Sequence, residues 1–353
     1  MHKKQEKVNV WRCFSCGSHN TTFKSRLINY FSFAFSSTWA GIFKAGSGFD
    51  LILVTSPPLF LGITAYILSR IRRIPIVFEI RDLWPESAID TGVVKNKALI
   101  NFAYRFEKFI YSNSKLINVL TPACRDSLVN KKNFPDSKVI CIPNAADFRL
   151  SDRYLEDFNS TEFRKSKGID DKFVIVYVGA HGVANHLIQL LDAAELIKET
   201  NVLFLLIGDG MQKTMLVNES ETRGLNNIRF VDPVPKREAL KYIMASDIGT
   251  SVLKRAEIFK TIYSNKTFDY MACKKPILLL IDGVSRDLIE KAKCGIFAEP
   301  ERPHDIAEKI GYCVEHPDEL KAMGENGYLY AKEHFDRNKL ADKYLEHLIK
   351  IKK

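Results

Sequence analysis

The 353-residue sequence lacks the features that would assign it to a specialised class of protein. It contains no internal repeat and no low-complexity tract, and 46% of its residues are hydrophobic, so a mainly disordered chain is excluded. Residues 1–11 have no apolar core like that of a signal peptide, which predicts a cytoplasmic protein. Because the chain is about twice the usual domain size, two domains are expected.

Cysteine is scarce and irregularly spaced. The seven cysteines are an odd number and follow no disulfide-framework pattern, which favours a reducing compartment. Cys13 and Cys16 form one Cys-x-x-Cys, but no second pair or Cys/His cluster completes a tetrahedral zinc set. We interpret them as incidental thiols and predict no metal site.

Acidic residues are few in the first part of the chain. Residues 1–150 contain 21 Lys and Arg against 10 Asp and Glu, a net charge of +11, whereas the rest contains 31 against 32. A positive half predicts contact with an anionic surface, either phospholipid or nucleic acid. The sequence has no aromatic-and-basic RNA signature and no recognition-helix motif, so the expected partner is an anionic membrane surface and not nucleic acid.

No segment has both the length and the apolar character expected of a membrane-spanning helix. Residues 27–43 are uncharged, but 17 residues are at the lower limit for a span, and Asn29 and four hydroxyl residues make the segment polar. Its six aromatic side chains favour a helix at a domain surface or at a membrane interface. An ordinary buried helix and a membrane-contacting helix both remain open at this point.

Short β-branched runs alternate with amphipathic stretches from residue 50 onward, as is typical of βα units around a parallel sheet. Four strands are predicted in the first part, over residues 50–56, 75–80, 115–120 and 138–143. Six are predicted in the second part, over residues 173–179, 202–208, 227–231, 247–252, 276–281 and 295–299. Helices are expected to begin near Pro58, Lys97 and Pro122, and others to cover 303–315, 317–334 and 337–351.

These patterns predict an α/β fold with two doubly wound, Rossmann-like domains that face a cleft. The expected divisions are a first domain over 1–147, a polar linker over 148–170, a second domain over 171–335 and a terminal helix over 336–353. Ligands of such sheets bind at the loops after the carboxyl ends of the strands, so functional residues are expected there.

Two glycine-containing turns follow strands of the second domain. One includes Gly179, His181 and Gly182, and the next includes Gly208, Asp209 and Gly210. Glycine lets the backbone approach a ligand, and free N–H groups at a helix start suit a diphosphate. Tight packing explains such turns equally well. A proline-bounded loop over 231–240, with Val234 and Pro235, is suited to a planar base.

The most specific stretch covers residues 259–276. Ser264 and Asn265 are expected to cap a helix whose first turn presents Lys266 and Asp269 on one face. A cation at this position can bind a phosphate, and a carboxylate can accept hydrogen bonds from ribose hydroxyls. The structural alternative is a solvated Lys–Asp pair beside a buried apolar stripe.

The run SNKTFDYMACKKPIL (264–278) resembles the segment S/P-x-K-x-F-E-Y-M-A-x-G-K-P of the retaining glycosyltransferases of family 4, which have the GT-B fold. The order of EIRDLWPES (79–87), IPNAAD (142–147), YVGAHG (177–182) and IGDG (207–210) agrees with that family. EIRDLWPES and YVGAHGVAN together resemble the bacterial subgroup that includes the N-acetyl-L-fucosamine transferases of O-antigen and capsule assembly.

The resemblance implies transfer of a sugar, here an N-acetylated amino sugar, from a UDP-sugar to a polyprenyl-diphosphate-linked saccharide, with retention and without a metal or other cofactor. It implies that Asp269 binds the donor ribose, that Lys266 lies by the diphosphate and that the 233–235 loop holds the base. Arg81 and Asp82 stand where many relatives have His-Asp on the acceptor side. The protein would be peripheral at the inner face of the plasma membrane.

The sequence departs from the family pattern at three places. Thr261 stands where many members have a glutamate that contacts the donor sugar, and the usual Arg and Lys after the Gly179 turn are absent, so Lys254, Arg255 and Lys266 are candidates for the cation. The chain also begins after the strand, glycine turn and helix that open a GT-B domain, which predicts a truncation of about 60–70 residues. A catalytically impaired homologue and a UDP-sugar epimerase of similar fold are the alternatives.

Overall fold

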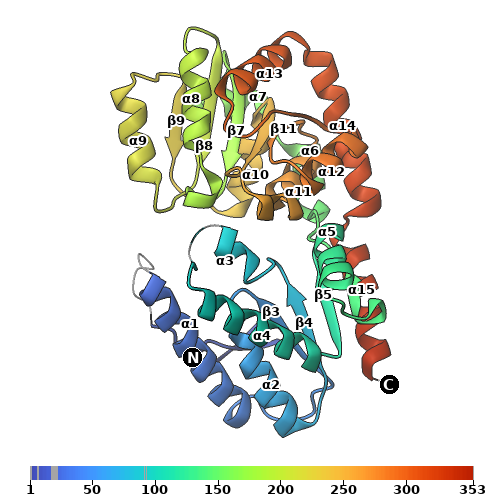
Figure 1. Cartoon of the computed structure of the whole chain (residues 1–353). Coiled ribbons are helices and arrows are strands. Elements are labelled where there is room, and N and C mark those ends of the chain that lie inside the picture. Colours follow the sequence, from blue (N-terminus) through green and yellow to red (C-terminus); the bar gives the residue numbers. More distant parts are fainter. Residues whose placement is uncertain (1, 6–7, 17–22, 91, 93, 353) are drawn as a thin grey trace. The chain divides into compact units, whose positions relative to one another are not determined.

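The computed structural model of the chain describes residues 2–5, 8–16, 23–90, 92 and 94–352. The chain divides into two compact units, one formed by residues 1–142 with 343–353 and the other by residues 143–342. Each unit has its own parallel sheet, with four strands in the first and six in the second (Figure 1). All ten predicted strands are therefore confirmed, and their ends agree with the prediction to within two residues.

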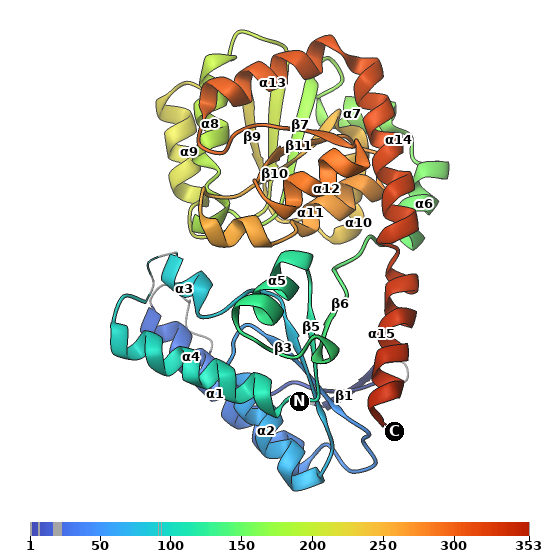
Figure 2. The ribbon, with the colours of Figure 1, turned by 45° about the vertical axis from the view of Figure 1, so that its right-hand side comes forward.

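The four-stranded parallel sheet of the first unit has the order β3-β4-β5-β6, and β1 and β2 form a separate antiparallel pair. Its two inner strands are buried at all positions but one, which explains why their sequences are continuous apolar runs. Helices α1, α2 and α4 gather on one side of this sheet (Figure 2). The elements of this unit are β1 (His2–Gln5), β2 (Val8–Trp11), α1 (Phe23–Phe43), β3 (Ile52–Ser56), α2 (Leu61–Arg72), β4 (Ile76–Ile80), α3 (Glu86–Asp90), α4 (Lys97–Asn113), β5 (Leu116–Val119), α5 (Pro122–Asp126), η1 (Ser127–Lys131), η2 (Asp136–Lys138) and β6 (Val139–Cys141).

The sheet of the second unit has the order β12-β11-β10-β7-β8-β9. The chain runs outward from β7 in one direction, returns beside β7 with β10, and then runs outward in the other direction. This reversal places the topological switch point, where doubly wound sheets bind ligands, between β7 and β10. The strands are β7 (Phe173–Val178), β8 (Val202–Ile207), β9 (Ile228–Val231), β10 (Ile248–Val252), β11 (Ile277–Leu280) and β12 (Gly295–Phe297).

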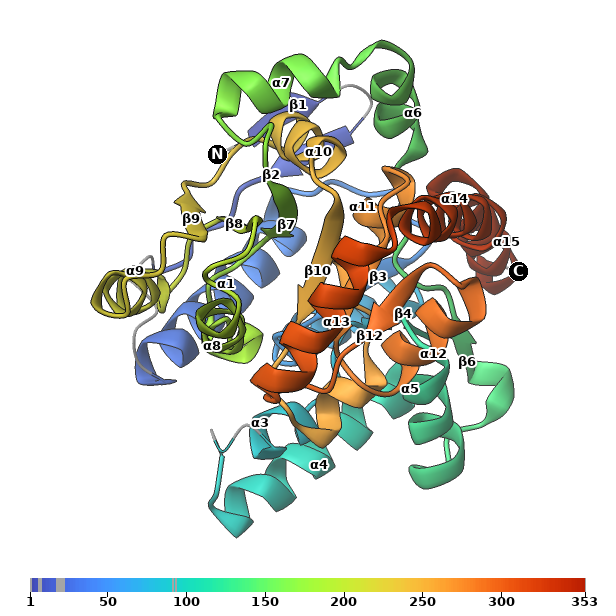
Figure 3. The same ribbon diagram turned by 90° about the horizontal axis from the view of Figure 1, so that it is seen from above.

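Two hydrophobic cores cover the two faces of this sheet. Helices α8, α9 and α13 contribute to one core and α10, α11, α12 and α14 to the other (Figure 3). The helical elements are η3 (Val183–Asn185), α8 (Ile188–Leu196), α9 (Lys213–Thr222), α10 (Lys236–Ala245), η4 (Glu257–Thr261), α11 (Asn265–Ala272), α12 (Val284–Ala292), α13 (Pro303–Glu315), α14 (Pro317–His334) and α15 (Arg337–Lys352). The three helices predicted at the end of the chain are confirmed as α13, α14 and α15.

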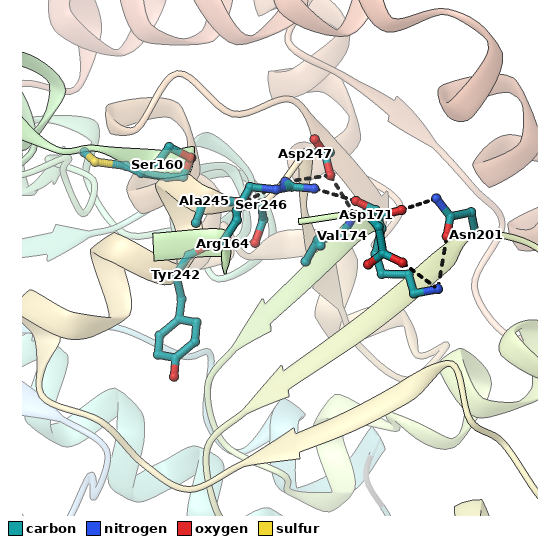
Figure 4. A network of polar contacts seen from close by, with 11 residues as sticks. Ser160, Arg164, Asp171, Val174, Asn201, Tyr242, Ala245, Ser246 and Asp247 are labelled. Atoms are coloured by element: carbon teal, nitrogen blue, oxygen red, sulfur yellow. Dashed lines mark hydrogen bonds and ion pairs between the residues drawn. The ribbon is translucent and has the colours of Figure 1, made fainter. Parts of the chain in front are cut away.

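The predicted linker over residues 148–170 is wrong. This segment forms α6 (Phe148–Asp157) and α7 (Ser160–Lys167), which pack on α10 within the second unit. Arg164 of α7 donates to the carbonyl of Ala245 at 2.7 Å and to the Asp247 carboxylate at 3.1 Å, and that carboxylate accepts from the Val174 amide at 2.7 Å (Figure 4). The segment is polar in composition, but its sparse aromatic residues all face the core.

The domain limits also differ from the expected ones. The division falls between Ile142 and Pro143 instead of at residue 147, and residues 343–353 of the terminal helix belong with the first unit. Tyr344 illustrates this, because its hydroxyl is buried and its pKa is raised, first by burial and then by the charge of Glu79 in β4. The terminal helix is therefore part of the packing of the first unit.

Candidate functional site

The two glycine turns of the second unit pack against each other, backbone on backbone. The amide of His181 donates to the carbonyl of Asp209 at 2.8 Å. Gly208 has φ near +146°, and a Cβ on it would overlap the carbonyl of Gly179, while a Cβ on Gly210 would lie 2.6 Å from the carbonyl oxygen of His181. Glycine is therefore required at both positions for the turns after β7 and β8 to meet.

Lys266 lies directly over Gly179. A Cβ on Gly179 would overlap the end of the lysine side chain, whose Nζ lies 4.9 Å from the centroid of the Tyr177 ring. Burial lowers the pKa of Lys266 to about 8, and the charge of Asp269 partly offsets this effect. No carboxylate of the described residues lies within 4 Å of this ammonium, so its position is suited to an anionic ligand.

The first turn of α11 begins at the switch point. Ser264 occupies the N-cap position, but its hydroxyl makes no cap hydrogen bond and donates instead to the Ser251 hydroxyl in β10 at 3.2 Å. The predicted capping by the Ser264 side chain is therefore wrong, because a neighbouring strand competes for the hydroxyl. Asn265 is exposed and its side-chain oxygen accepts from Asn144 at 2.6 Å. The N–H groups of the first turn have no side-chain cap. That of Thr267 donates to the carbonyl of Ser264 at 3.1 Å, and those of Asn265 and Lys266 are suited to a phosphate.

Asp269 is accessible and is part of a small charged cluster. Its carboxylate lies 3.6 Å from the ammonium of Lys236, which is also 3.9 Å from Asp147, and Asp147 pairs with Arg337 at 2.6 Å. Burial raises the pKa of Asp269, and the charge of Lys236 is the first of the effects that oppose it. Sequence reasoning missed Lys236, although it directly follows the loop in which a base site is expected.

The loop over residues 231–240, which is expected to hold the base, is hydrogen-bonded to the second glycine turn. Val234 is half-buried against the core, Pro235 is exposed and begins α10, and Asp232 pairs with Lys213 of α9 at 2.6 Å. Because Gly208 donates to the carbonyl of Val231 at 3.0 Å, the turn and the loop form one continuous edge. The carboxyl ends of β7, β8 and β9 thus bring together the two glycine turns and the expected base loop.

His181 belongs to the turn expected to face the diphosphate, and its side chain points into the protein. The ring is fully buried, both ring nitrogens lack a hydrogen-bond partner, and it packs near Tyr177 and Phe230. Burial, followed by the charge of Lys213, lowers its pKa to about 4. The imidazole is therefore neutral and packs beneath the two turns, while the backbone of His181 makes the hydrogen bond that joins them.

This burial predicts a pH dependence of stability. The unfolded chain binds a proton on His181 below about pH 6.5 and the folded chain only near pH 4, so the free energy of unfolding falls as pH drops through this interval, by up to about 3 kcal/mol. Urea titrations of the protein at pH 7.5, 6 and 5 measure the loss. A His181→Gln variant should show a flatter dependence over that interval, and equal slopes for the two proteins would contradict the assignment.

Lys254 and Thr261 flank the other side of the switch point. The amide of Lys254 donates to the carbonyl of Ala184 at 2.8 Å, so the loop after β10 touches the segment after Gly179, and the Lys254 side chain is exposed without an ion pair among the described residues. The Thr261 hydroxyl donates to the carbonyl of Ile258 at 2.7 Å. Lys254 and Arg255 line a small hollow of about 30 Å³ with Asp282 and Glu299.

β7 and β10 separate at the switch point, and Tyr270 fills the gap. The strands pair only through Ile248 with Ile175 and Gly249 with Val176. Beyond these pairs the buried Tyr270 hydroxyl donates to the carbonyl of Thr250 at 3.0 Å, lies 3.3 Å from the carbonyl of Val176 and accepts from the Val178 amide at 3.4 Å. One side chain of α11 therefore satisfies the backbone where the two strands diverge.

Removal of this hydroxyl should be costly. We expect Tyr270→Phe to lower the free energy of unfolding by about 2 kcal/mol, because a buried amide and a buried carbonyl lose their partner. Chemical denaturation measures the change. Tyr312→Phe removes an exposed hydroxyl that bonds Glu319 and serves as the control. A change in Tyr270→Phe no larger than that of the control would contradict the assigned role.

Arg81 and Asp82 lie in the first unit, directly after β4. The amide of Arg81 donates to the carbonyl of Ser56 at 3.3 Å, and its side chain is exposed. Asp82 is half-buried; burial raises its pKa, and the charge of Arg81 opposes this effect. Both side chains therefore follow a carboxyl strand end, as predicted, in a unit separate from that of the other candidates.

Comparison with known families matches both units. Residues 4–145 match the family described as glycosyl transferase 4-like domain, and residues 159–330 match the family described as glycosyl transferases group 1. The chain consists of two glycosyltransferase domains. The finding agrees with the glycosyltransferase family predicted from the sequence.

Similar proteins support the same fold. A protein of Escherichia coli K12 named as the colanic acid biosynthesis glycosyl transferase WcaI is 23% identical over 69% of this chain and 60% of its own length, so the chain spans less than two thirds of that relative. The crystal structure of HepE from Anabaena in complex with UDP-glucose has a TM-score of 0.72 at 18% identity, over 93% of this chain and 84% of that one. Sucrose-phosphate synthase from Thermosynechococcus elongatus has a TM-score of 0.77 at 14% identity, over 99% and 84%. The fold is GT-B.

Proposed function

We propose that this glycosyltransferase transfers a sugar from a UDP-sugar to a saccharide acceptor. The observation that carries the proposal is the position of the Lys266 ammonium over the turn at Gly179, which packs against the turn at Gly208, beside the start of α11 that lacks a side-chain cap. A desolvated cation, closely approachable backbone and free helix N–H groups together form a site for a diphosphate. The structural similarity to HepE, crystallised with UDP-glucose, supports a uridine nucleotide as the donor.

Three groups of residues bind three different parts of the donor nucleotide. The N–H groups of α11 and Lys266 hold the diphosphate, the Asp269 carboxylate accepts hydrogen bonds from the ribose hydroxyls, and the loop with Val234 and Pro235 supports the base. As the bond between the sugar and the diphosphate breaks, negative charge grows on the leaving phosphate oxygen. A fixed cation and fixed N–H dipoles stabilise that charge, which is the largest contribution such a site can make to the rate.

The finer assignments of the proposal rest on the sequence motifs. The resemblance of EIRDLWPES and YVGAHGVAN to N-acetyl-L-fucosamine transferases supports an N-acetylated amino sugar, transferred with retention, as the donor group. It also supports a polyprenyl-diphosphate-linked acceptor in O-antigen or capsule synthesis at the inner face of the plasma membrane. We assign Arg81 and Asp82 to the acceptor and propose that the transfer needs no metal ion.

Calorimetric titration with UDP, GDP and ADP tests the donor site. We expect selective binding of UDP and about a tenfold or greater loss in Asp269→Ala, because a hydrogen bond to a charged carboxylate is removed. Asp170→Ala, a change at an exposed carboxylate without an ion pair among the described residues, should bind as the wild type. Absence of binding to all three nucleotides would overturn the proposal in favour of an impaired homologue, and equal binding of all three would overturn the uridine assignment.

A further inference from the structure

Helix α1 of the first unit has an inverted distribution of polar and apolar side chains. From Leu27 to Phe43 every exposed side chain is large and apolar, and these residues recur once in each turn. They are Ile28 (57% exposed), Phe31 (49%), Phe35 (78%), Trp39 (50%) and Phe43 (67%). We call this set the α1 stripe. A helix on the surface of a water-soluble domain normally presents polar residues to water, so the stripe faces a different environment.

The polar residues of the same helix bond to the protein. The Ser36 hydroxyl donates to the carbonyl of Phe14 at 2.6 Å, the Ser32 hydroxyl accepts from the amide of Cys16 at 2.9 Å, and the Thr38 hydroxyl donates to Thr64 of α2 at 2.9 Å. These bonds fix the rotation of α1 about its axis. The outward direction of the stripe is therefore a specified feature and not an accident of an amphipathic sequence.

Exposed aromatic side chains are concentrated in the first unit, and many of them lie in the α1 stripe. All nine exposed Phe and Trp side chains of the described residues lie in the first unit, and four of them are in the stripe. Helix α4, on the same side of the sheet (Figure 2), adds exposed Phe102 and Phe109. No helix among the described residues meets the length and hydropathy needed to cross a bilayer, so a surface that lies on the bilayer is the geometry that these side chains fit.

Basic residues gather where α1 and α2 end together. Arg72 donates to the carbonyl of Gly41 at 2.6 Å, which ties the two helix ends, and the Lys44 ammonium lies 5.4 Å from the centroid of the Trp39 ring. Arg70 and Arg73 line a hollow of about 500 Å³ beside Tyr66. None of these four cations pairs with a carboxylate among the described residues. In the cluster of Lys44, Arg70, Arg72 and Arg73, Lys44 lies against the stripe at Trp39 and Arg72 binds the end of α1, while Arg70 and Arg73 lie at the end of α2. The cluster thus supplies positive charge at the end of the helix pair that carries the stripe.

We propose that the α1 stripe and this basic cluster form a docking surface for an anionic lipid bilayer. The aromatic side chains enter the boundary between headgroups and acyl chains, and the cluster binds the lipid phosphates, with α1 lying in the plane of the membrane. The charge of the cluster decides between possible occupants, because a second copy of this chain would bring the same positive charge to the same surface. This surface is separate from the donor site, and the inference does not depend on the proposed donor.

Sedimentation with vesicles tests the proposal. The protein should bind vesicles of phosphatidylglycerol and phosphatidylethanolamine, and bind phosphatidylcholine vesicles at least about tenfold more weakly. The double variant Phe35→Ser/Trp39→Ser should lose at least about tenfold in binding to the anionic vesicles, since two buried aromatic side chains are removed. Leu329→Ser, at an exposed apolar position of α14, should bind as the wild type. The variants change exposed side chains, so folding is expected to be retained.

A charge variant tests the electrostatic contribution to vesicle binding. Lys44→Gln/Arg70→Gln should weaken binding to anionic vesicles and reduce its dependence on salt, whereas Lys198→Gln/Lys291→Gln, at exposed positions of the second unit, should change neither.

Wild-type protein that does not sediment with anionic vesicles, or stripe variants that sediment equally well, would overturn the proposal. A dimer in gel filtration that the stripe variant converts to a monomer, without vesicle binding, would assign the surface to a second copy. UDP titration of the same variants, expected to be unchanged, keeps this test distinct from that of the donor site.

Discussion

Lys266→Met is expected to weaken the binding of UDP by about 100-fold, the upper part of the range for a hydrogen bond to a charged group. Met has nearly the length of Lys, so the packing over Gly179 and Tyr177 is kept while the charge is removed. Calorimetric titration measures the loss. Lys198→Met removes an exposed charge elsewhere in the second unit and should leave the affinity unchanged.

The pH profile of the wild type provides a second readout of the same lysine. Because burial lowers the pKa of Lys266 to about 8, the ammonium loses its proton above that pH, and the affinity for UDP should then fall by up to about tenfold for each further pH unit. The Lys266→Met variant should lack this decline. An affinity that stays constant up to pH 9.5 would show that Lys266 does not face the diphosphate.

Gly208→Ala is expected to lower the free energy of unfolding by about 3 to 5 kcal/mol, at the severe end of single substitutions. The added methyl group would overlap the carbonyl of Gly179, and Gly208 has φ near +146°, a conformation that an L-residue rarely adopts. Since both turns must shift, UDP binding should be lost as well. Chemical denaturation and UDP titration measure the two effects.

Gly182→Ala is the matched control for Gly208→Ala. Gly182 lies in the same site, but its φ is −102°, and a Cβ there would meet only the side-chain oxygen of Asn185 at 3.4 Å. We expect a change in unfolding free energy within about 1 kcal/mol. If the two alanine variants were equally stable, the close backbone contact between the turns after β7 and β8 would not exist in solution.

The strands of both sheets could be predicted because they are buried on two faces. VLFLLI (202–207) and FVIVYV (173–178) are continuous apolar runs of strand length, and such runs in alternation with amphipathic stretches have few other solutions. The glycine turns were predictable for a related reason, because they follow predicted strand ends and the topology of a doubly wound sheet brings those ends to one edge. Lys266 instead stands 14 residues after the end of β10, and it was indicated by the expected helix start and by the family motif.

The errors come from side chains whose partners are distant in the sequence. The 148–170 segment resembles a linker because it is polar, yet Tyr154, Phe158 and Phe163 pack on the core, and Arg164 bonds to residues that lie some 80 positions later. His181 stands in a turn expected to face the diphosphate, and the burial of its ring beneath that turn could not be read from the neighbouring residues.

Lys236 was missed for the same reason. Its two acidic neighbours lie 33 positions later and 89 positions earlier, at Asp269 and Asp147. Only the positions of α10 and α11 at one sheet edge reveal the cluster.

Helix α11 joins the ligand site to the interior of its unit. Its first turn carries Lys266, while one turn later the Tyr270 hydroxyl is bonded to the backbone of β7 and β10, and Met271 lies close to Gly327 of α14. We therefore expect a substitution deep in α14 to shift the groups proposed to hold the nucleotide without touching them. Donor affinity and resistance to heat are expected to be coupled through this helix, so a search for tighter-binding variants with changes in α11 should also yield changes in melting temperature.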